Sequence, residues 1–247
     1  MLTTRDDFNY TPTEASGKTH ITMSQLDIVK KELSKKDFNE TSKTRLYAWI
    51  VLMILLTVQI ANQWQRFVIS TAYYYASETK TGPKYQIKEA IPNFTDANYG
   101  YVAGPLFSLI FGVMVLFTGS FSDQNNRKLI IGFATLFWSL TTLGMAFSKT
   151  FPVVCVCRIM LGALESFCPS AAYSLIADYF PQNKRTTANA FFAGCIFVGA
   201  SLSSLSAIFI GAFGWRMTFA IISLQGVISG LLIFLFVREP PRGRYDP

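Results

Sequence analysis

Six long apolar segments follow a polar start in this chain of 247 residues. A helix rises 1.5 Å per residue, so about 20 apolar residues cross the roughly 30 Å hydrocarbon core of a bilayer. Backbone polar groups in lipid must be bonded within the protein, and a helix bonds its own. The sequence therefore predicts an all-α integral membrane protein with six transmembrane helices, at residues 47–72, 99–118, 129–147, 151–176, 188–211 and 217–237.

The content and distribution of charged residues support an integral membrane protein and argue against a nucleic-acid-binding protein. Only 15% of the residues are charged, against roughly 25% in soluble proteins. The net charge is +7, but most basic residues lie before residue 46 or in short gaps between apolar segments, where they set membrane topology. We therefore expect the lipid bilayer as a partner and no nucleic acid.

The distribution of Lys and Arg predicts that both ends of the chain lie on the inner side of the membrane. Eleven flank the ends of the segments on the same side as the N-terminus: Lys35, Lys36, Lys43, Arg45, Arg127, Lys128, Lys184, Arg185, Arg238, Arg242 and Arg244. Five flank the opposite side: Lys80, Lys84, Lys88, Lys149 and Arg216. The triplet Asn93-Phe94-Thr95 then falls in the first outside loop, where it is a weak signal for glycosylation.

The polar N-terminal arm, residues 1–44, contains no apolar stretch typical of a signal peptide. Ser24 and Asp27 are spaced as an N-cap and an acid three residues later, and apolar residues then recur at helical spacing. We expect a short amphipathic helix at about residues 24–39. It can lie on the membrane, dock onto a partner or stay unfolded when alone.

Three charged residues lie within apolar segments, where charge is costly and indicates function. They are Arg66 in the first segment, and Arg158 and Glu165 in the fourth. Seven residues are close to two helical turns, so Arg158 and Glu165 share a face about 10 Å apart. The two interpretations, a solute or proton pathway and a structural ion-pair network, weigh evenly. A polar stripe around Arg66 slightly favours a cavity: Gln59, Asn62, Gln63 and Gln65.

The pattern of reactive side chains predicts no enzyme. The four cysteines all lie in apolar segments, and the single histidine, His20, lies in the polar arm without a second ligand nearby. No nucleophile with a base, no phosphate-binding loop and no metal-ligand spacing occurs in the sequence. We therefore expect no catalytic residue, no metal and no cofactor.

Several motifs resemble the N-terminal half of the major facilitator superfamily of transporters, over about residues 45–247. Gly119, Asp123, Arg127 and Lys128 match the signature after the second span, although Asn126 replaces a glycine. The other matching motifs are Arg158-x-x-x-Gly162-x-x-Glu165 and Gly214-Trp215-Arg216-x-x-Phe219. The resemblance implies half of that fold, a 3+3 helix repeat with an inside gate at which Asp123 latches. It also implies a charge network around Asp123: Arg127, Lys128 and Arg185.

Within that superfamily the chain looks most like the spinster-like lysolipid and sphingolipid transporters. This resemblance rests on three sequence motifs, Phe137–Gly144, Leu175–Phe180 and Arg238–Gly243. The resemblance implies that Arg66, Arg158 and Glu165 line a central cavity and that Glu165 couples transport to protons. The subfamily has an acid before the first-span arginine, and here that position is Gln65.

Because such transporters work with two six-helix halves, one half leaves its cavity face uncovered, and three hypotheses follow. The favoured one is a structural or accessory subunit of a larger complex, in which other membrane subunits cover that face and the arm, together with bound lipid. The second is a working carrier of a lipid-like or organic anionic solute, assembled from two halves. The third is the N-terminal fragment of a full-length carrier.

The compartment follows from the hypothesis. An accessory subunit suits the mitochondrial inner membrane, whereas a spinster-like carrier suits an endolysosomal or plasma membrane. This expectation rests on analogy alone.

Overall fold

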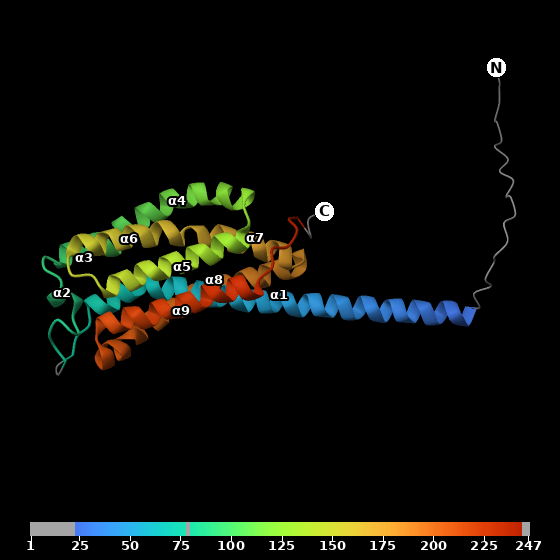
Figure 1. Ribbon diagram of the computed structural model, residues 1–247, viewed down its shortest axis with the longest axis horizontal. Helices are drawn as coiled ribbons and strands as arrows, with labels where there is room; N and C mark the ends of the chain where they lie inside the picture. The colour runs from blue at the N-terminus through green and yellow to red at the C-terminus, as the bar shows by residue number, and fades with distance from the viewer. Residues whose placement is uncertain (1–22, 78–79, 244–247) are drawn as a thin grey trace, which may run out of the picture. The chain divides into compact units, whose positions relative to one another are not determined.

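A computed structural model describes residues 23–77 and 80–243, with side-chain surroundings from residue 44 onward. Regular structure in these ranges is helical (Figure 1). The helices are α1 (Met23–Tyr73), α2 (Ile87–Ala90), α3 (Asp96–Ala103), α4 (Pro105–Gln124), α5 (Arg127–Ala146), α6 (Phe151–Glu165), α7 (Phe167–Tyr179), α8 (Gln182–Phe213) and α9 (Trp215–Phe236). This confirms the all-α membrane class. The first 22 residues of the arm lie outside the described residues.

The chain divides into two compact units, Met1–Arg45 and Leu46–Pro247. Residues 24–39, where the sequence predicts a short amphipathic helix, fall within the bounds of α1, Met23–Tyr73. The amphipathic character of that helix stays a prediction. The six-helix unit from Leu46 onward holds the residues considered below.

Six stretches of the described residues are long and apolar enough to cross a membrane, as predicted. They are Thr44–Tyr73, Asp96–Gln124, Arg127–Ala146, Phe151–Tyr179, Gln182–Phe213 and Trp215–Phe236. The observed helices reach beyond most of the expected spans. The additional turns carry polar residues, which a search for apolar runs leaves out but a helix end near water tolerates.

Two of the six spans are interrupted by proline. Pro105 follows Gly104, whose backbone leaves the helical region with φ −104° and ψ −97°, and this separates α3 from α4. Pro169 has no N–H to donate to the carbonyl of Glu165 four residues earlier. Helix α6 accordingly ends at Glu165 and α7 begins at Phe167. The break places Glu165 at a helix end inside the fourth span.

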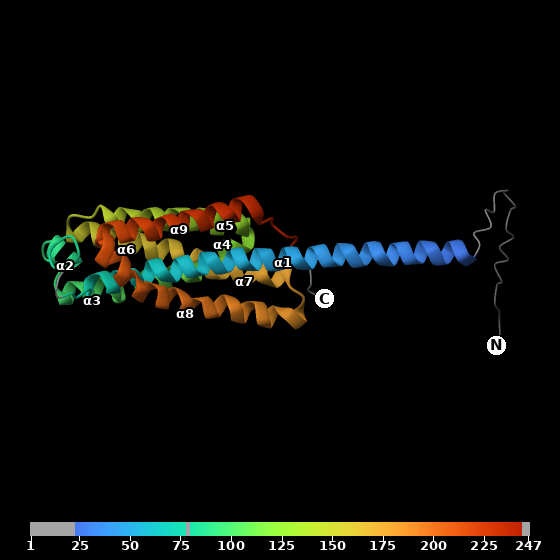
Figure 2. The same cartoon turned by 90° about the horizontal axis from the view of Figure 1, so that it is seen from below.

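The helices differ strongly in how much of them the unit buries. Helix α5 packs chiefly against α9. Of its most apolar stretch of 18 residues, 61% is buried, against 17% for the corresponding stretch of α3–α4 and 28% for that of α8. Helix α4 lies at the edge of the bundle in Figure 1, and α8 lies at the edge in Figure 2. Large apolar side chains are exposed along α4: Leu109, Val113, Leu116 and Phe117. The stretch α3–α4 and helix α8 are therefore the least covered of the six spans within the unit.

The loop after α1 is fastened to the turn between α8 and α9. The indole Nε1 of Trp215 donates to Pro83 O at 3.0 Å, and its backbone N donates to Lys84 O at 3.2 Å. Gly214 has φ 88°, and a Cβ there would lie 2.5 Å from Lys84 O. Only glycine fits both the backbone conformation and the close approach. The loop thereby closes this end of the bundle.

Candidate functional site

A buried ion pair connects the first and fourth spans at the break after α6. Arg66 Nε donates to Glu165 Oε2 at 2.9 Å, and Arg66 Nη2 lies 2.9 Å from the same oxygen. The Glu165 side chain is fully buried, whereas that of Arg66 is 20% exposed. Glu165 Oε1 has no hydrogen-bond partner among the described residues. The arginine therefore lies between the carboxylate and the surface of the unit.

Aromatic side chains of α4 hold the Arg66 guanidinium in place. Its Cζ lies 4.7 Å from the ring centroids of both Phe107 and Phe111, which stack on each other at 5.8 Å. A cation over an aromatic face is attracted by the ring quadrupole, most strongly where water is excluded. The Arg66 guanidinium is thus bonded to Glu165 and packed against the two rings.

Arg158 shares α6 with Glu165 but bonds elsewhere. Its Nε donates to Val102 O at 3.2 Å and its Nη1 donates to Arg66 O at 3.0 Å. Its side chain is buried and also lies over the Phe107 ring, at 5.1 Å. Arg158 therefore ties α6 to α3 and α1 through backbone carbonyls, and the cation bonded to Glu165 comes from another helix. The expectation of a cavity-lining Arg158 stays a prediction.

Gln65, adjacent to Arg66 in sequence, points into a different part of the bundle. Its Nε2 donates to Ile222 O at 3.1 Å and to Ser139 Oγ at 3.4 Å, and its Oε1 accepts from Thr142 Oγ1 at 2.8 Å. Successive helix residues differ by about 100° in direction. Gln65 therefore joins α1 to α5 and α9, apart from the ion pair.

The rest of the polar stripe on α1 is buried and incompletely bonded. Gln63 Nε2 donates to Asn62 Oδ1 at 3.0 Å, while Gln59 Oε1 and Asn62 Nδ2 have no partner among the described residues. Buried polar groups are normally satisfied by protein or ordered water. The expected cavity beside these amides remains a prediction.

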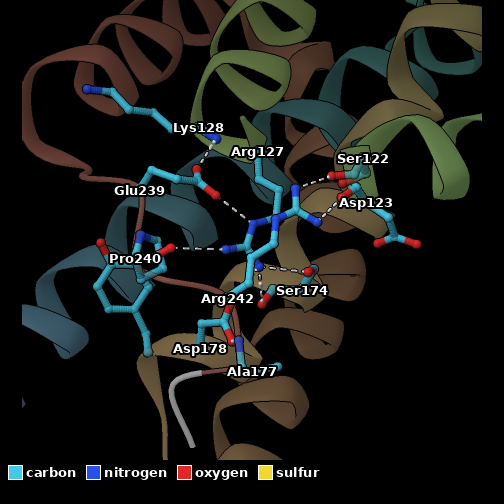
Figure 3. Close-up of polar contacts among 12 residues, drawn as sticks. Ser122, Asp123, Arg127, Lys128, Ser174, Ala177, Asp178, Glu239, Pro240 and Arg242 are labelled. Carbon is cyan, nitrogen blue, oxygen red and sulfur yellow. Dashed lines mark hydrogen bonds and ion pairs between the residues drawn. The ribbon is translucent and has the colours of Figure 1, made fainter. Parts of the chain in front are cut away.

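A second polar cluster lies at the ends of α5, α7 and α9, and its centre is Arg127 (Figure 3). Arg127 Nη1 donates to Asp178 Oδ2 at 2.6 Å and Nε donates to Glu239 Oε1 at 2.7 Å. The side chain of Arg127 is 1% exposed. The backbone N of Lys128 donates to Glu239 Oε2 at 3.0 Å. We call these residues, together with Arg242, the Arg127 network.

Arg242, in the segment after α9, completes the network by capping α4. Its Nη2 donates to Ser122 O at 2.9 Å and to Asn125 O at 2.7 Å, and its Nη1 donates to Asp123 O. The last carbonyls of a helix have no partner within the helix, so a cation there is stabilising. The backbone N of Gly243 donates to Asp178 Oδ1 at 2.9 Å. One short segment thus joins the ends of three helices.

The structure arranges the predicted gate residues differently from the expectation. The network expected around Asp123 is centred on Arg127, and the Asp123 carboxylate points away from it (Figure 3). Lys128 takes part through its backbone, and Arg185 Nη2 donates to Ala177 O at 2.8 Å. A Cβ on Gly119 would meet no other atom within 4 Å. The gate role of these residues stays a prediction.

Sequence reasoning gave three members of the network no place at the gate: Asp178, Glu239 and Arg242. Arg242 counted only among the basic residues that set topology. Each lies in a motif that resembles spinster-like proteins, near the end of an apolar span. A charged residue near the end of a span is ordinary for a membrane protein, so the sequence offers no signal that these three meet. Among the described residues no group of three potential metal ligands occurs.

Comparisons with known proteins identify the family of this chain. The family profile described as Major Facilitator Superfamily matches residues 47–247. Protein spinster homolog 1 of Rattus norvegicus is 27% identical over 210 residues, covering 83% of this chain and 37% of the relative. The human homolog is 28% identical over 201 residues, covering 80% and 36%. The chain thus spans less than half the length of these relatives.

Two further comparisons extend the likeness. The sphingosine-1-phosphate transporter SPNS2 of Danio rerio is 32% identical over 149 residues, covering 59% of this chain and 27% of that protein. A crystal structure of a bacterial homolog to the human lysosomal transporter spinster, inward-facing and occupied, superposes with a TM-score of 0.69 at 25% identity. It covers 81% of this chain and 46% of the other. The chain therefore belongs to the major facilitator superfamily, with spinster homologs among its relatives.

Proposed function

We propose that this six-helix unit is one wall of a proton-coupled carrier for a lipid-like anionic solute. The observation that carries the proposal is the Arg66 and Glu165 pair, in which a fully buried carboxylate is covered by a partly exposed arginine. Such a pair inside membrane spans is costly, and charged residues there mark solute and ion pathways. The relatives named as spinster homologs and as a sphingosine-1-phosphate transporter support the solute class.

The proposed coupling is a competition for one arginine. An anionic headgroup that binds the exposed side of Arg66 draws the guanidinium away from Glu165. A buried carboxylate without its cation binds a proton, because an unpaired charge in a low dielectric is unfavourable. Return of Arg66 to Glu165 then favours release of both solute and proton.

The test measures uptake of a fluorescent lysophospholipid or sphingoid phosphate into vesicles containing the purified protein with its co-purified partners. We expect Glu165→Gln to abolish the dependence of uptake on an imposed pH gradient while exchange without a gradient persists. The matched control is Glu89→Gln, which makes the same change at an exposed position on α2. Gradient-driven uptake that is unchanged in Glu165→Gln would contradict the coupling.

The accessory-subunit hypothesis makes a different prediction, which the composition of the native particle tests. The comparisons support the transporter class and give no support to an accessory subunit or to a mitochondrial membrane. Native electrophoresis after mild detergent extraction, followed by mass spectrometry, should therefore find a small particle. A stable particle of many unrelated subunits, together with absent uptake, would overturn the carrier proposal.

We place the carrier in an endolysosomal or plasma membrane. The support is the resemblance to spinster proteins, one of which is a bacterial homolog described by its likeness to a human lysosomal transporter. Colocalisation of the tagged chain with lysosomal or surface markers tests this. A mitochondrial pattern would contradict it.

A further inference from the structure

The segment before α3 presents an asparagine and a threonine on its outer side. Asn93 is exposed and has φ 62°, a conformation that asparagine adopts more readily than most residues. Phe94 is 3% exposed and packs on the aromatic cluster of this loop, with its ring centroid 5.2 Å from that of Tyr73. Thr95 is exposed again, in extended backbone with φ −78° and ψ 168°. The buried ring thus anchors a turn whose two flanking polar residues face outward.

Two hydrogen bonds hold this turn against the start of α3. The side-chain Nδ2 of Asn98 donates to Asn93 O at 2.6 Å, and Thr95 Oγ1 accepts from Asn98 N at 3.3 Å as the N-cap of α3. Neither bond uses the side-chain amide of Asn93. Asn93 is therefore an exposed residue on an ordered turn, and these bonds leave its side-chain amide unused.

We propose that Asn93 carries an N-linked oligosaccharide. Asn93-Phe94-Thr95 is an Asn-x-Thr acceptor, and such acceptors are modified on exposed loops of the secretory pathway. In the reaction Asn93 Nδ2 attacks the anomeric carbon of an oligosaccharide linked to a lipid pyrophosphate. The new N–C bond forms, the C–O bond to the pyrophosphate breaks, the amide loses one proton and the lipid pyrophosphate departs. The lipid-linked oligosaccharide of the secretory-pathway membrane is the sugar donor, and the membrane-bound oligosaccharyltransferase catalyses the transfer.

Asn93 lies outside the second span. It precedes by three residues the stretch Asp96–Gln124, which is long and apolar enough to cross a membrane. The first turns of α3 carry exposed polar residues, among them Asp96. The acceptor therefore lies beyond the apolar part of the second span.

Two other Asn-x-Thr triplets occur in the sequence, at Asn9 and at Asn39. Both precede the first span, and Asn93 follows it, so a single crossing separates them from Asn93 in either orientation. The excess of Lys and Arg on the flanks that share the side of the N-terminus predicts that side to be cytoplasmic. Asn93 then faces the lumen, and Asn9 and Asn39 do not.

The experiment is expression of the full chain in cells with a secretory pathway, followed by peptide N-glycosidase treatment and denaturing electrophoresis of the carbonate-resistant membrane fraction. We expect the protein to lose the mass of one glycan on treatment. Asn93→Gln and Thr95→Ala should abolish that shift, and Thr95→Ser should retain it because serine also supplies the hydroxyl. Asn9→Gln and Asn39→Gln are matched controls that should leave the shift unchanged.

Two outcomes would overturn the proposal. A membrane-inserted wild-type chain whose mobility does not change on treatment shows that Asn93 is not modified. A shift that disappears in Asn9→Gln or Asn39→Gln shows instead that the N-terminus faces the lumen. Because the sugar is added to the chain before it is fully folded and is read on a denatured one, reduced stability of a variant does not obscure the result.

Discussion

Gln65 shows why an amide suits its position better than an acid. It donates to Ile222 O and accepts from Thr142 Oγ1, so it uses both halves of its side chain between three helices. An ionised carboxylate has no proton to donate to a carbonyl. A Cβ on Gly226 would collide with Gln65 Nε2 and Ser139 Oγ, so a glycine on α9 provides the space for this bond. Gln65 thus connects α1 to α5 and α9 by hydrogen bonds, while the neighbouring Arg66 pairs with Glu165.

We expect Gln65→Glu to lower the free energy of unfolding by about 1–3 kcal/mol, because the carbonyl of Ile222 loses its side-chain donor and a charge is buried. The measurement is an SDS titration of the purified protein in mixed micelles. Gln124→Glu makes the same change at an exposed site near the end of α4 and should change stability by less than about 0.5 kcal/mol. Equal changes in the free energy of unfolding for the two variants would show that the hydrogen bonds of Gln65 do not stabilise the bundle.

At the scale of elements, the Arg127 network predicts that two aspartates near the same end of the bundle differ. Asp178→Asn removes the carboxylate 2.6 Å from Arg127 Nη1 and should cost about 1–3 kcal/mol, because a buried cation loses a charge-assisted hydrogen bond. Asp123→Asn alters a side chain that points away from the network (Figure 3) and should leave stability unchanged. Thermal unfolding of both variants in detergent measures the difference. A larger loss of stability in Asp123→Asn than in Asp178→Asn would instead support a charge network centred on Asp123.

The crossing of α1 and α8 provides a second prediction at this scale. A Cβ on Gly199 would lie 2.5 Å from Gln63 Cβ and 2.9 Å from Ile60 O, whereas one on Gly194 would meet nothing within 4 Å. Gly199→Ala should therefore destabilise by about 1–3 kcal/mol through overpacking. Gly194→Ala on the same helix should stabilise by up to about 1 kcal/mol, because alanine favours helix. Unfolding curves that move in the same direction for both would refute the close contact.

At the scale of the whole unit, polar contacts fasten the bundle at both ends. The Arg127 network joins the ends of α4, α5, α7 and α9, and Trp215 joins the loop after α1 to the opposite end of α9. Helix α9 has 22 residues, a length of about 33 Å. The Arg66 and Glu165 pair lies within the spans between them.

This separation predicts that the two ends contribute independently to stability. Asp178→Asn and Trp215→Phe act at sites with no shared partner, so the double variant should lose the sum of the two single losses within about 0.5 kcal/mol. Trp215→Phe replaces the indole with a smaller aromatic ring and removes the Nε1 hydrogen bond to Pro83 O. The check is a double-mutant cycle from SDS titrations. A larger coupling would mean that the bundle transmits strain between its ends.

The membrane class, the six spans and the family can all be predicted from the amino-acid sequence. Each rests on a property local to the chain: a run of apolar residues long enough to cross lipid, or a motif within a few positions. The spans were placed to within a few residues, and Glu165 and Arg66 stood out because a charge in an apolar run is rare. The expected match over about residues 45–247 is confirmed by the family profile at 47–247.

The contacts between these residues, in contrast, become visible only in the three-dimensional structure. Helical periodicity placed Glu165 with Arg158 on one face, yet the bonded cation is Arg66, 99 positions away. It likewise left open that Gln65 turns towards Ile222 and that Arg127 gathers the network. Such pairings depend on how each helix is rotated about its axis and shifted along its neighbours. Those two quantities are set by side-chain packing and glycine contacts between helices, which no local pattern in the chain contains.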